Sequence, residues 1–487
     1  MDMPADRNGR AWLPVAAVAL LLALAFLGAR PLWDPDEGRY TNVALEMLRS
    51  RDWIDLARNQ ETGHWTKPPL TYQAIAVSLA LLGHNAWAAR LPSALAYLLT
   101  VWLVARCARR LVPGAEKEAA LIFATMLLPF AASQFVSTDA LLCALEALGM
   151  VGYVELRFGT GARSWIFTLC MALGFGAAFL TKGPPALLPL LAIVAVEGVA
   201  PSHRVRLLPA LSGVALGAAV AAPWFLVVGH RHPGLLGYLF AQEVVDRTTG
   251  THVAHNGAWF DWIAIYVPTL LLGTLPWGGT LWRAVRGIPS ALRRREAEVL
   301  FLVLWVGLPL LVFCIARSRL PLYLLPLCVP LTLLVARQRR AEGRGLPRPA
   351  LLALWVGALL AVKLAAATWP TPLDAQAFAQ AIRQRAPGAV TEVVFVEDPP
   401  HYGLHLYLGS EIEEVSYAHL NDHPFDPDYD EDLGDELAEQ ETGRVFVTKE
   451  GQWDEVIRWL DLLGYRPVAL GRPFEEHVIF QVTPRPV

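Results

Sequence analysis

Long apolar runs recur along the chain from near its start to about residue 368. A helix of about twenty apolar residues crosses the hydrocarbon core of a bilayer, so each long run predicts a membrane-spanning helix. Roughly eleven spans are expected on this criterion. They cover 12–29, 88–106, 119–136, 140–158, 165–180, 187–199, 207–228, 262–282, 299–316, 320–336 and 350–368. The pattern predicts an all-α polytopic membrane domain over residues 1–369.

The distribution of basic residues orients these spans. Lys and Arg collect in short cytoplasmic loops, and the chain has basic clusters at 283–295 and 337–344. Both clusters fall inside the cell if the N-terminus is cytoplasmic and the short apolar run 68–83 lies on the membrane surface. We therefore expect a multi-pass protein of the bacterial inner membrane. Its first outer loop, residues 30–87, and its C-terminal region would both face the periplasm.

The C-terminal region is polar and acidic. From residue 371 onward it carries roughly 23 acidic and roughly 8 basic side chains, a balance that disfavours binding to nucleic acid or anionic lipid. Short β-branched or aromatic runs at 390–396, 444–448 and 477–482 alternate with helix-like stretches. Residues 370–487 are thus predicted to form a small periplasmic α/β domain. The Asp-rich segment 421–435 offers ligands for a hard cation, although most such segments are simply solvated loops.

The first outer loop begins with a dense group of charges. Segment 34–40 reads Asp-Pro-Asp-Glu-Gly-Arg-Tyr and directly follows the first span. One interpretation is that Asp36, Glu37 and Arg39 cap the following helix and pair with one another. The other is catalytic: a carboxylate orients or deprotonates an acceptor, while the Arg39 guanidinium helps to hold a phosphate.

Further cations fall at outer helix ends, against the general preference of basic residues for the cytoplasmic side. Lys67 precedes two prolines, which fix the backbone and so the direction of its ammonium group. The other cations of this set are Lys182, Arg247 and Arg319. Tyr323 adds a hydroxyl group close to Arg319 in the sequence. Each cation alone fits snorkelling to anionic lipid. Several outer junctions that supply cations to one face nevertheless predict a single anion site.

Two acidic residues belong to the fourth predicted span. Asp139 lies at its outer start, and Glu146 falls on the same helical face. Asp139 either caps the helix or serves as a second functional acid, because an ionisable residue in a span is a functional candidate. Glu146 is expected to be buried against a polar partner.

Metal and nucleotide sites receive less support. His230, His232, His252 and His255 share one outer loop, and His64 lies in the first loop. No cysteine or carboxylate at fixed spacing completes a zinc site, so no required cofactor is expected, with a divalent metal left open. No phosphate-cradling glycine loop or dinucleotide fingerprint is present in the sequence. An outer site would also lack access to cytoplasmic nucleotides, so a lipid-linked donor is expected.

The chain resembles the GT-C glycosyltransferases of the dolichyl-phosphate-mannose protein mannosyltransferase-like superfamily. Among these it is most similar to the bacterial aminoarabinose (lipid A) transferases. The order and the spacing of short motifs both agree across the membrane region. The motifs are Asp36-Glu37-x-Arg39-Tyr40, Glu46-Met47-Leu48, Asp52-Trp53, Lys67-Pro68-Pro69, Ala89-Arg90-Leu91-Pro92-Ser93, Thr138-Asp139, Phe179-Leu180-Thr181-Lys182-Gly183-Pro184 and Leu320-Pro321-x-Tyr323 followed by Leu325-Pro326.

This resemblance implies an inverting transfer of a sugar from undecaprenyl phosphate to an acceptor at the periplasmic face. The sugar would be 4-amino-4-deoxy-L-arabinose and the acceptor lipid A. The acidic residues implied are Asp36, with Glu37 beside it, and Asp139 as a second site. The residues implied to hold the donor phosphate or line its cavity are Arg39, Lys67, Arg247, Tyr323, Lys182 and Arg319.

Three alternatives stay open. The same fold can transfer another sugar to lipopolysaccharide core, protein or another glycan. A transporter or flippase of lipid-linked sugar is an alternative of another class, but it predicts polar residues through the middle of several spans, whereas here they gather at one side. A structural or sensory membrane protein leaves the outer cations unexplained.

Overall fold

The computed structural model describes residues 12–160, 163–200, 204–241, 256–418, 424–439 and 442–485. The chain divides into two compact units, each built from segments far apart in the sequence. One unit combines Met1–Leu27 with Arg90–Leu364, and the other combines Gly28–Ala89 with Ala365–Val487. The first unit contains the apolar helices, and the second contains the first outer loop together with the C-terminal region.

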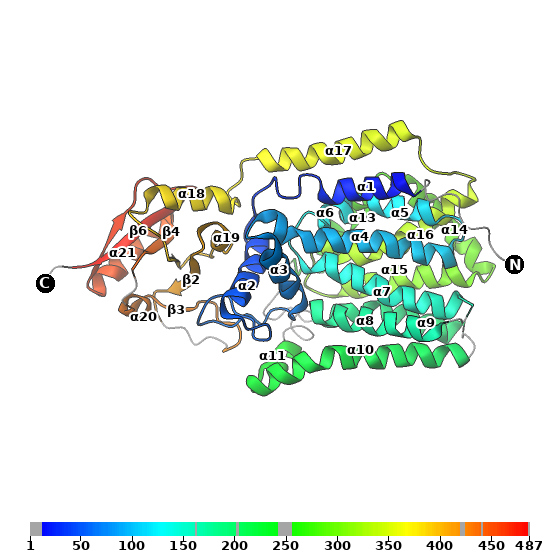
Figure 1. The fold of residues 1–487 in the computed structure, drawn as a ribbon, viewed down its shortest axis with the longest axis horizontal. Coiled ribbons are helices and arrows are strands. Elements are labelled where there is room, and N and C mark those ends of the chain that lie inside the picture. The colour runs from blue at the N-terminus through cyan, green and yellow to red at the C-terminus, as the bar shows by residue number, and fades with distance from the viewer. Residues whose placement is uncertain are drawn as a thin grey trace. The chain divides into compact units, whose positions relative to one another are not determined.

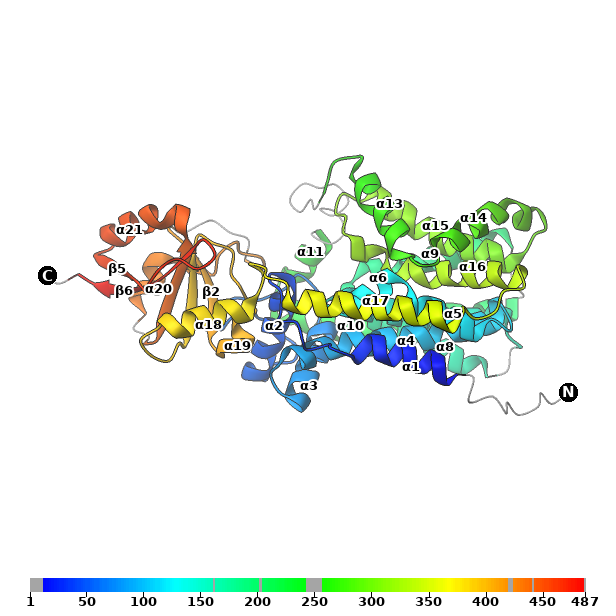
Figure 2. The same ribbon diagram turned by 90° about the horizontal axis from the view of Figure 1, so that it is seen from above.

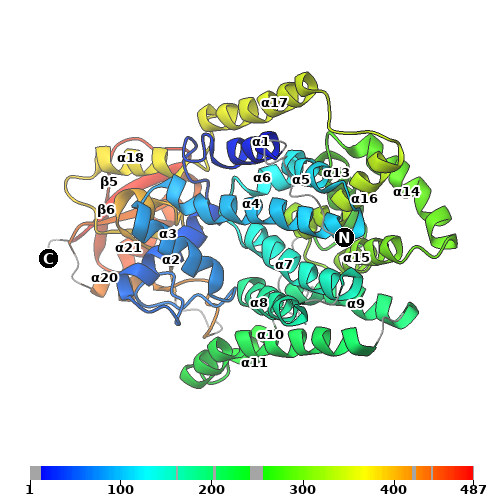
Figure 3. The same cartoon turned by 45° about the vertical axis from the view of Figure 1, so that its right-hand side comes forward.

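The helical unit follows the predicted apolar runs (Figure 1). Its elements are α1 (Leu13–Leu24), α4 (Ala86–Leu111), α5 (Glu116–Thr125), α6 (Leu127–Ala132), α7 (Thr138–Phe158), α8 (Ser164–Lys182), η2 (Pro184–Leu187), α9 (Leu188–Val199), α10 (Arg204–Arg231), α11 (Leu235–Phe240), α13 (Asp261–Gly273), α14 (Gly278–Arg293), α15 (Ala297–Ile315), η4 (Pro321–Leu327), α16 (Cys328–Ala341) and α17 (Pro349–Thr368). Figures 2 and 3 show α17 beside α1, where Val356 and Leu359 pack with Leu22 and Phe130.

Among the described residues, six helices are both long and apolar enough to cross a membrane. They are Ala86–Leu111, Ser164–Lys182, Leu207–Arg231, Ala297–Ile315, Pro321–Ala341 and Pro349–Thr368. The mostly helical, membrane-type fold class is thereby confirmed, whereas the count of eleven spans stays a prediction. Helix α7 is long enough but carries Asp139, Glu146 and Glu155, which lower its mean hydropathy.

Two predicted spans are each divided into two helices. The run 119–136 forms α5, which ends at Thr125, and α6, which begins at Leu127 after an extended residue, Met126. The run 262–282 is not one helix, because α13 ends at Gly273 and α14 begins at Gly278. Pro276 lies in the break and has no N–H to donate to a continuing helix. Helix α14 then carries Arg283, Arg286 and Arg293 and is amphipathic, as suits a surface position.

The C-terminal region contains one six-stranded sheet of order β3-β2-β1-β4-β6-β5. The strands are β1 (Glu392–Val396), β2 (Glu411–Ser416), β3 (Glu431–Asp432), β4 (Arg444–Lys449), β5 (Tyr465–Ala469) and β6 (His477–Pro484). Strands β1 to β4 pair in parallel, and β6 runs antiparallel to both β4 and β5. The predicted α/β character is confirmed, and the three predicted runs correspond to β1, β4 and β6.

Helices cover both faces of this sheet. They are α18 (Ala375–Arg385), α19 (Leu404–Leu408), α20 (Leu433–Ala438), α21 (Trp453–Leu462) and the short η5 (Glu450–Gln452). Phe378 and Leu404 of the first two pack on one face, against Phe395. Leu433 of α20 and Val456 of α21 pack on the other face. Strand β1 is therefore buried on both faces, which explains its continuous apolar sequence.

The first outer loop forms two helices, α2 (Asp36–Ser50) and α3 (Leu70–Leu82), which pack against each other. Backbone hydrogen bonds join this loop to the start of the C-terminal region. The Asp34 N–H donates to the Leu373 carbonyl at 2.9 Å, and the Ala375 N–H donates to the Leu32 carbonyl at 3.2 Å. Loop and sheet domain together form the second compact unit.

Candidate functional site

The charged segment at the start of α2 gives its carboxylates separate environments. The Glu37 side chain is 2% exposed, pairs with Arg30 at 2.8 Å and accepts the Trp33 N–H at 3.0 Å. These contacts close the turn before α2, which has no side-chain cap at Pro35. The Asp36 side chain is 71% exposed and pairs with Arg39 at 2.8 Å. Of the two neighbours, Asp36 is the carboxylate that a substrate can reach.

Lys67 lies in a buried polar group within the same loop. Its side chain is 6% exposed, and the ammonium donates to the Thr66 carbonyl at 2.8 Å. Next to it, His64 Nε2 lies 2.8 Å from the Thr66 hydroxyl and 3.0 Å from the Tyr72 hydroxyl. Burial, followed by the charges of Arg39, Arg58 and Lys67, holds the pKa of His64 well below its ordinary value. His64 is therefore neutral, and Lys67 supplies the cation.

Asp139 and Lys182 form a buried ion pair in the helical unit. Asp139 is in the first turn of α7, and Lys182 is the last residue of α8. Their side chains are 9% and 7% exposed and make a direct ion pair. The Lys182 ammonium also lies 4.4 Å from the ring centroid of Tyr323. Three of the predicted site residues thus meet in one place, although they come from distant parts of the sequence.

Arg319 is buried and holds backbone carbonyls. It is 2% exposed, and its guanidinium donates to the carbonyls of Asn256, Ala258 and Cys314 at 2.7–3.1 Å. Arg319 thus fixes the chain just before η4, which carries Tyr323. Residues 242–255 lie outside the described residues. They include the predicted phosphate ligand Arg247 and two members of the predicted histidine group, His252 and His255.

The predicted site residues fall into two sets. Asp36, Glu37, Arg39 and Lys67 belong to the unit that contains the first outer loop, whereas Asp139, Lys182, Arg319 and Tyr323 belong to the helical unit. Within each set the structure places acids beside cations. The convergence of both sets on one phosphate stays a prediction.

Sequence reasoning missed the residues by which the C-terminal domain holds the first loop. The Asp34 carboxylate accepts the Gly403 N–H at 2.9 Å, and its second oxygen lies 3.6 Å from His401 Nδ1. Arg58 pairs with Asp430 at 2.7 Å. Each contact joins residues more than 360 positions apart, so no local motif signals it.

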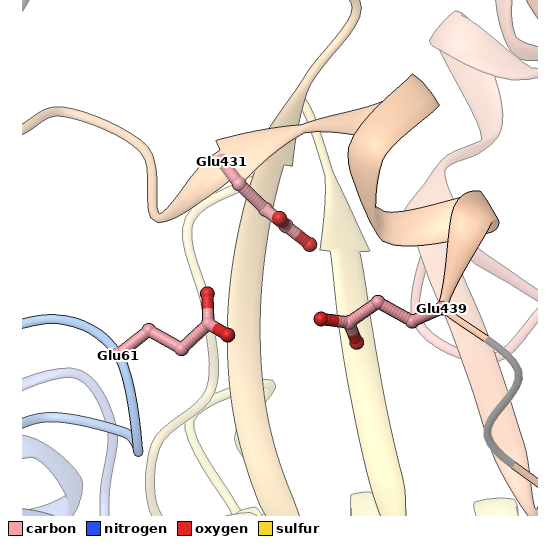
Figure 4. Close-up of side chains that lie close together, drawn as sticks. All are labelled: Glu61, Glu431 and Glu439. Carbon is pink, nitrogen blue, oxygen red and sulfur yellow. The ribbon is translucent and has the colours of Figure 1, made fainter.

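Three glutamates with metal-like spacing lie where the loop meets the sheet. Carboxylate oxygens of Glu61, Glu431 and Glu439 lie within 4.8 Å of one another. Figure 4 shows their side chains pointing toward each other. Glu431 belongs to the Asp-rich segment 421–435, of which residues 421–423 lie outside the described residues. Exposed acidic groups of this kind are common without an ion.

A second, buried group of glutamates lies around Arg444. Arg444 pairs with Glu392, Glu436 and Glu439 at 2.5–2.9 Å, and Glu413 lies close to the first two. Burial, and next the Glu392 charge, raises the pKa of Glu413 to about 9. Burial and a hydrogen bond with Glu431 raise the pKa of Glu436 to about 11. Protonation of Glu413 and Glu436 lowers the negative charge of this group, and the Arg444 guanidinium pairs with the carboxylates around it.

Comparison with known proteins places this architecture in a family. Residues 66–227 match the family described as dolichyl-phosphate-mannose-protein mannosyltransferase. A Proteus mirabilis protein named undecaprenyl phosphate-alpha-4-amino-4-deoxy-L-arabinose arabinosyl transferase 2 is 31% identical over 331 residues. That match covers 66% of this chain and 59% of the relative. A Pseudomonas aeruginosa protein of the same description, without the number, is 33% identical over 65% of this chain and 57% of its own. The match thus spans less than two thirds of the length of these relatives.

Solved structures share the fold over almost the whole chain. ArnT from Cupriavidus metallidurans bound to undecaprenyl phosphate superposes with a TM-score of 0.79 at 21% identity. The match covers 97% of this chain and 98% of that one. The Archaeoglobus fulgidus oligosaccharyltransferase follows with a TM-score of 0.57 at 11% identity, covering 94% of this chain and 73% of its own.

Apolar helices and relatives of this kind identify a multi-pass protein of the bacterial inner membrane. The family match covers residues 66–227, and the fold match covers 97% of the chain. The chain belongs to the GT-C glycosyltransferases, close to the bacterial aminoarabinose transferases.

Proposed function

We propose that this protein transfers 4-amino-4-deoxy-L-arabinose from undecaprenyl phosphate to lipid A at the periplasmic face of the inner membrane. The observation that carries the proposal is the sequence match, at 31–33% identity, to transferases named for this donor. The fold shared with an ArnT structure that holds undecaprenyl phosphate supports the same donor. The basic clusters at 283–295 and 337–344 support the periplasmic orientation, because such clusters stay in the cytoplasm.

The proposed reaction is a single inverting displacement. An acceptor oxygen attacks the anomeric carbon of the sugar, and the bond from that carbon to the phosphate oxygen breaks. The electron pair stays on undecaprenyl phosphate, which leaves with increased negative charge. Preorganised cations stabilise such a charge in the transition state. Arg39, Lys67, Arg247 and Tyr323 are assigned to the donor phosphate, and Lys182 and Arg319 to the lining of the same cavity.

Asp36 is assigned to the acceptor. Its exposure leaves the carboxylate accessible, whereas Glu37 is held by Arg30 and the Trp33 N–H. A hydroxyl acceptor would lose its proton to Asp36. A phosphate acceptor, as on lipid A, carries its own negative charge, so Asp36 would then orient it. Asp139 keeps the Lys182 ammonium in place through their buried ion pair.

Mass spectrometry of lipid A tests the proposed substrates. Cells that express the protein should carry lipid A with added aminoarabinose, and cells that lack it should not. An unchanged lipid A profile under inducing conditions would overturn this assignment. Purified protein supplied with a panel of undecaprenyl-phosphate sugars then identifies the donor, and turnover with another sugar would point to a different glycan product.

A further inference from the structure

Asp34 is a buried carboxylate just before the first turn of α2. Its side chain is 3% exposed. One oxygen accepts the Gly403 N–H at 2.9 Å, and the other lies 3.6 Å from His401 Nδ1. The Asp34 N–H donates to the Leu373 carbonyl at 2.9 Å. Asp34 is therefore held on both its backbone and its side chain by residues of the C-terminal domain.

Two glycines leave the carboxylate no room to move. A Cβ added at Gly38 would lie 1.7 Å from Asp34 Oδ1 and 2.4 Å from the Gly403 nitrogen. A Cβ at Gly403 would lie 2.6 Å from the Ala375 Cβ and 2.9 Å from Asp34 Oδ2. The first turn of α2, the Asp34 carboxylate and the chain at Gly403 are thus in direct van der Waals contact. A shift of one of them requires a shift of the others.

We propose that Asp34, held by Gly403 and His401, is a positioning residue that fixes the first turn of α2 and thereby Asp36 for sugar transfer. This inference rests on the proposed function, because it gives Asp36 its role. It also makes the C-terminal domain part of the catalytic arrangement, since the residues that hold Asp34 come from that domain. A displacement of about 1 Å at a reacting group can lower a rate by about 100-fold.

The energetics of the contact support a role beyond stability. A buried carboxylate is costly in free energy, and apolar residues of similar size often stabilise such a position equally well or better. Burial raises the pKa of Asp34 above its ordinary value, although the His401 and Gly403 contacts lower it. A polar contact that contributes little net stability but holds one geometry is suited to positioning.

A matched pair of variants separates positioning from general destabilisation. Asp34→Ala removes the contact, and Asp34→Asn keeps an oxygen that can accept the Gly403 N–H. Asp398→Ala is the control, because Asp398 is an equally buried carboxylate of the same compact unit. Its partners, His477 at 3.2 Å and Lys449 at 3.0 Å, both lie in the sheet. All variants are made in the full-length protein.

Two measurements are compared. Hydrogen exchange of the backbone amides of residues 36–40 reports the order of the first turn, and steady-state kinetics with undecaprenyl-phosphate aminoarabinose report transfer. In Asp34→Ala we expect faster exchange at 36–40 and a kcat lowered about 10- to 100-fold, with a KM for the donor within about twofold. Asp34→Asn should recover most of kcat, and Asp398→Ala should leave both readouts close to the wild-type values.

Each outcome decides the proposal. Unchanged exchange at 36–40 in Asp34→Ala, or an equal loss of kcat in Asp398→Ala, would overturn it. If Asp34→Ala does not accumulate in the membrane, His401→Gln provides the second test. We expect faster exchange at 36–40 and a lower kcat, both by smaller factors than in Asp34→Ala. Unchanged exchange at 36–40 in His401→Gln would overturn the proposal. A wild-type protein that transfers no sugar would instead refute the proposed function, while the exchange data would still show whether Asp34 orders α2.

Discussion

Neighbouring carboxylates at the start of α2 differ in what surrounds them. Asp34 is held by the C-terminal domain, Glu37 closes the turn with Arg30, and Asp36 remains exposed beside Arg39. From the sequence alone, Asp36 and Glu37 were assigned to the same catalytic group, and Asp34 had no separate role. Burial and hydrogen-bond partners distinguish them, and these depend on the three-dimensional fold.

Substitution of Asp36 or Lys67 should abolish transfer. Asp36→Asn removes the charge that orients or deprotonates the acceptor, and Lys67→Ala removes a cation from the donor phosphate. We expect kcat/KM to fall at least about 100-fold in each variant, with normal insertion measured by membrane fractionation. Glu61→Gln, an exposed carboxylate of the same loop, should retain activity. Near-normal turnover of Asp36→Asn or Lys67→Ala would refute the role of that residue.

Replacement of Glu413 should stabilise the protein in a pH-dependent way. The pKa of this buried carboxyl is about 9 in the folded protein, against an ordinary value of 4.5. Because the folded pKa is raised, the contribution of Glu413 to stability is full below pH 4.5 and is lost as pH rises toward 9.

Glu413→Gln removes this loss. We expect the variant to gain at least about 1 kcal/mol relative to the wild type between pH 5 and pH 8. Thermal unfolding of the full-length protein at both pH values measures the gain. The exposed Glu450→Gln variant should show the same difference from wild type at the two pH values. A Glu413→Gln effect independent of pH would contradict the raised pKa.

At the scale of elements, hydrophobic pattern predicted the helices and the most buried strands. Strands β1 and β4 were found because each has a run of consecutive apolar residues, 393–396 and 445–447. Strand β2 was missed because three of its six residues are glutamate, and β3 is only two residues long. The break between α13 and α14 was missed because residues on both sides of Pro276 are apolar enough to continue a span.

The contact between loop and sheet should depend strongly on Arg58 and Asp430. Asp430 is 1% exposed, and its second oxygen accepts the Glu414 N–H at 2.8 Å. Arg58→Ala would leave this carboxylate buried without a counter-charge, at a cost of about 3–5 kcal/mol. The double variant Arg58→Ala/Asp430→Ala should cost less than the sum of the single variants.

A double-mutant cycle measured by thermal unfolding gives the coupling, which we expect to be about 1–3 kcal/mol. The exposed pair Arg485–Asp461, whose side chains are 54% and 48% exposed, serves as the reference. Its coupling should be about 0–1 kcal/mol. Additive effects at Arg58 and Asp430 would show that the ion pair does not join the two elements.

At the scale of the whole molecule, apolar runs and charge bias were sufficient to predict a polytopic membrane protein with a C-terminal α/β domain. They could not predict that the first outer loop and the C-terminal region form one compact unit. Hydropathy and charge are properties of local segments. The Asp34–Gly403 and Arg58–Asp430 contacts depend on the meeting of segments that are far apart in the chain.

The topology predicts which introduced cysteines a membrane-impermeant maleimide can reach. The native cysteines are buried or half-buried in helices, so their background labelling should be low. Asp454→Cys in the sheet domain should react in spheroplasts, whereas Arg294→Cys should react only after the membrane is permeabilised. Both positions are exposed. Labelling of Arg294→Cys in intact spheroplasts would reverse the proposed orientation.

The shared unit of first loop and C-terminal domain has a consequence for biosynthesis. Gly28–Ala89 leaves the ribosome long before its partner segment, which begins at Ala365. At about 5–20 residues per second, synthesis of the intervening chain takes tens of seconds. Throughout that time the nascent loop lacks the segment that completes its compact unit, which is available only when the last part of the polypeptide has been synthesised. Premature termination before Gly403 would therefore leave Asp34 without the contacts that hold it, however well the membrane helices had inserted.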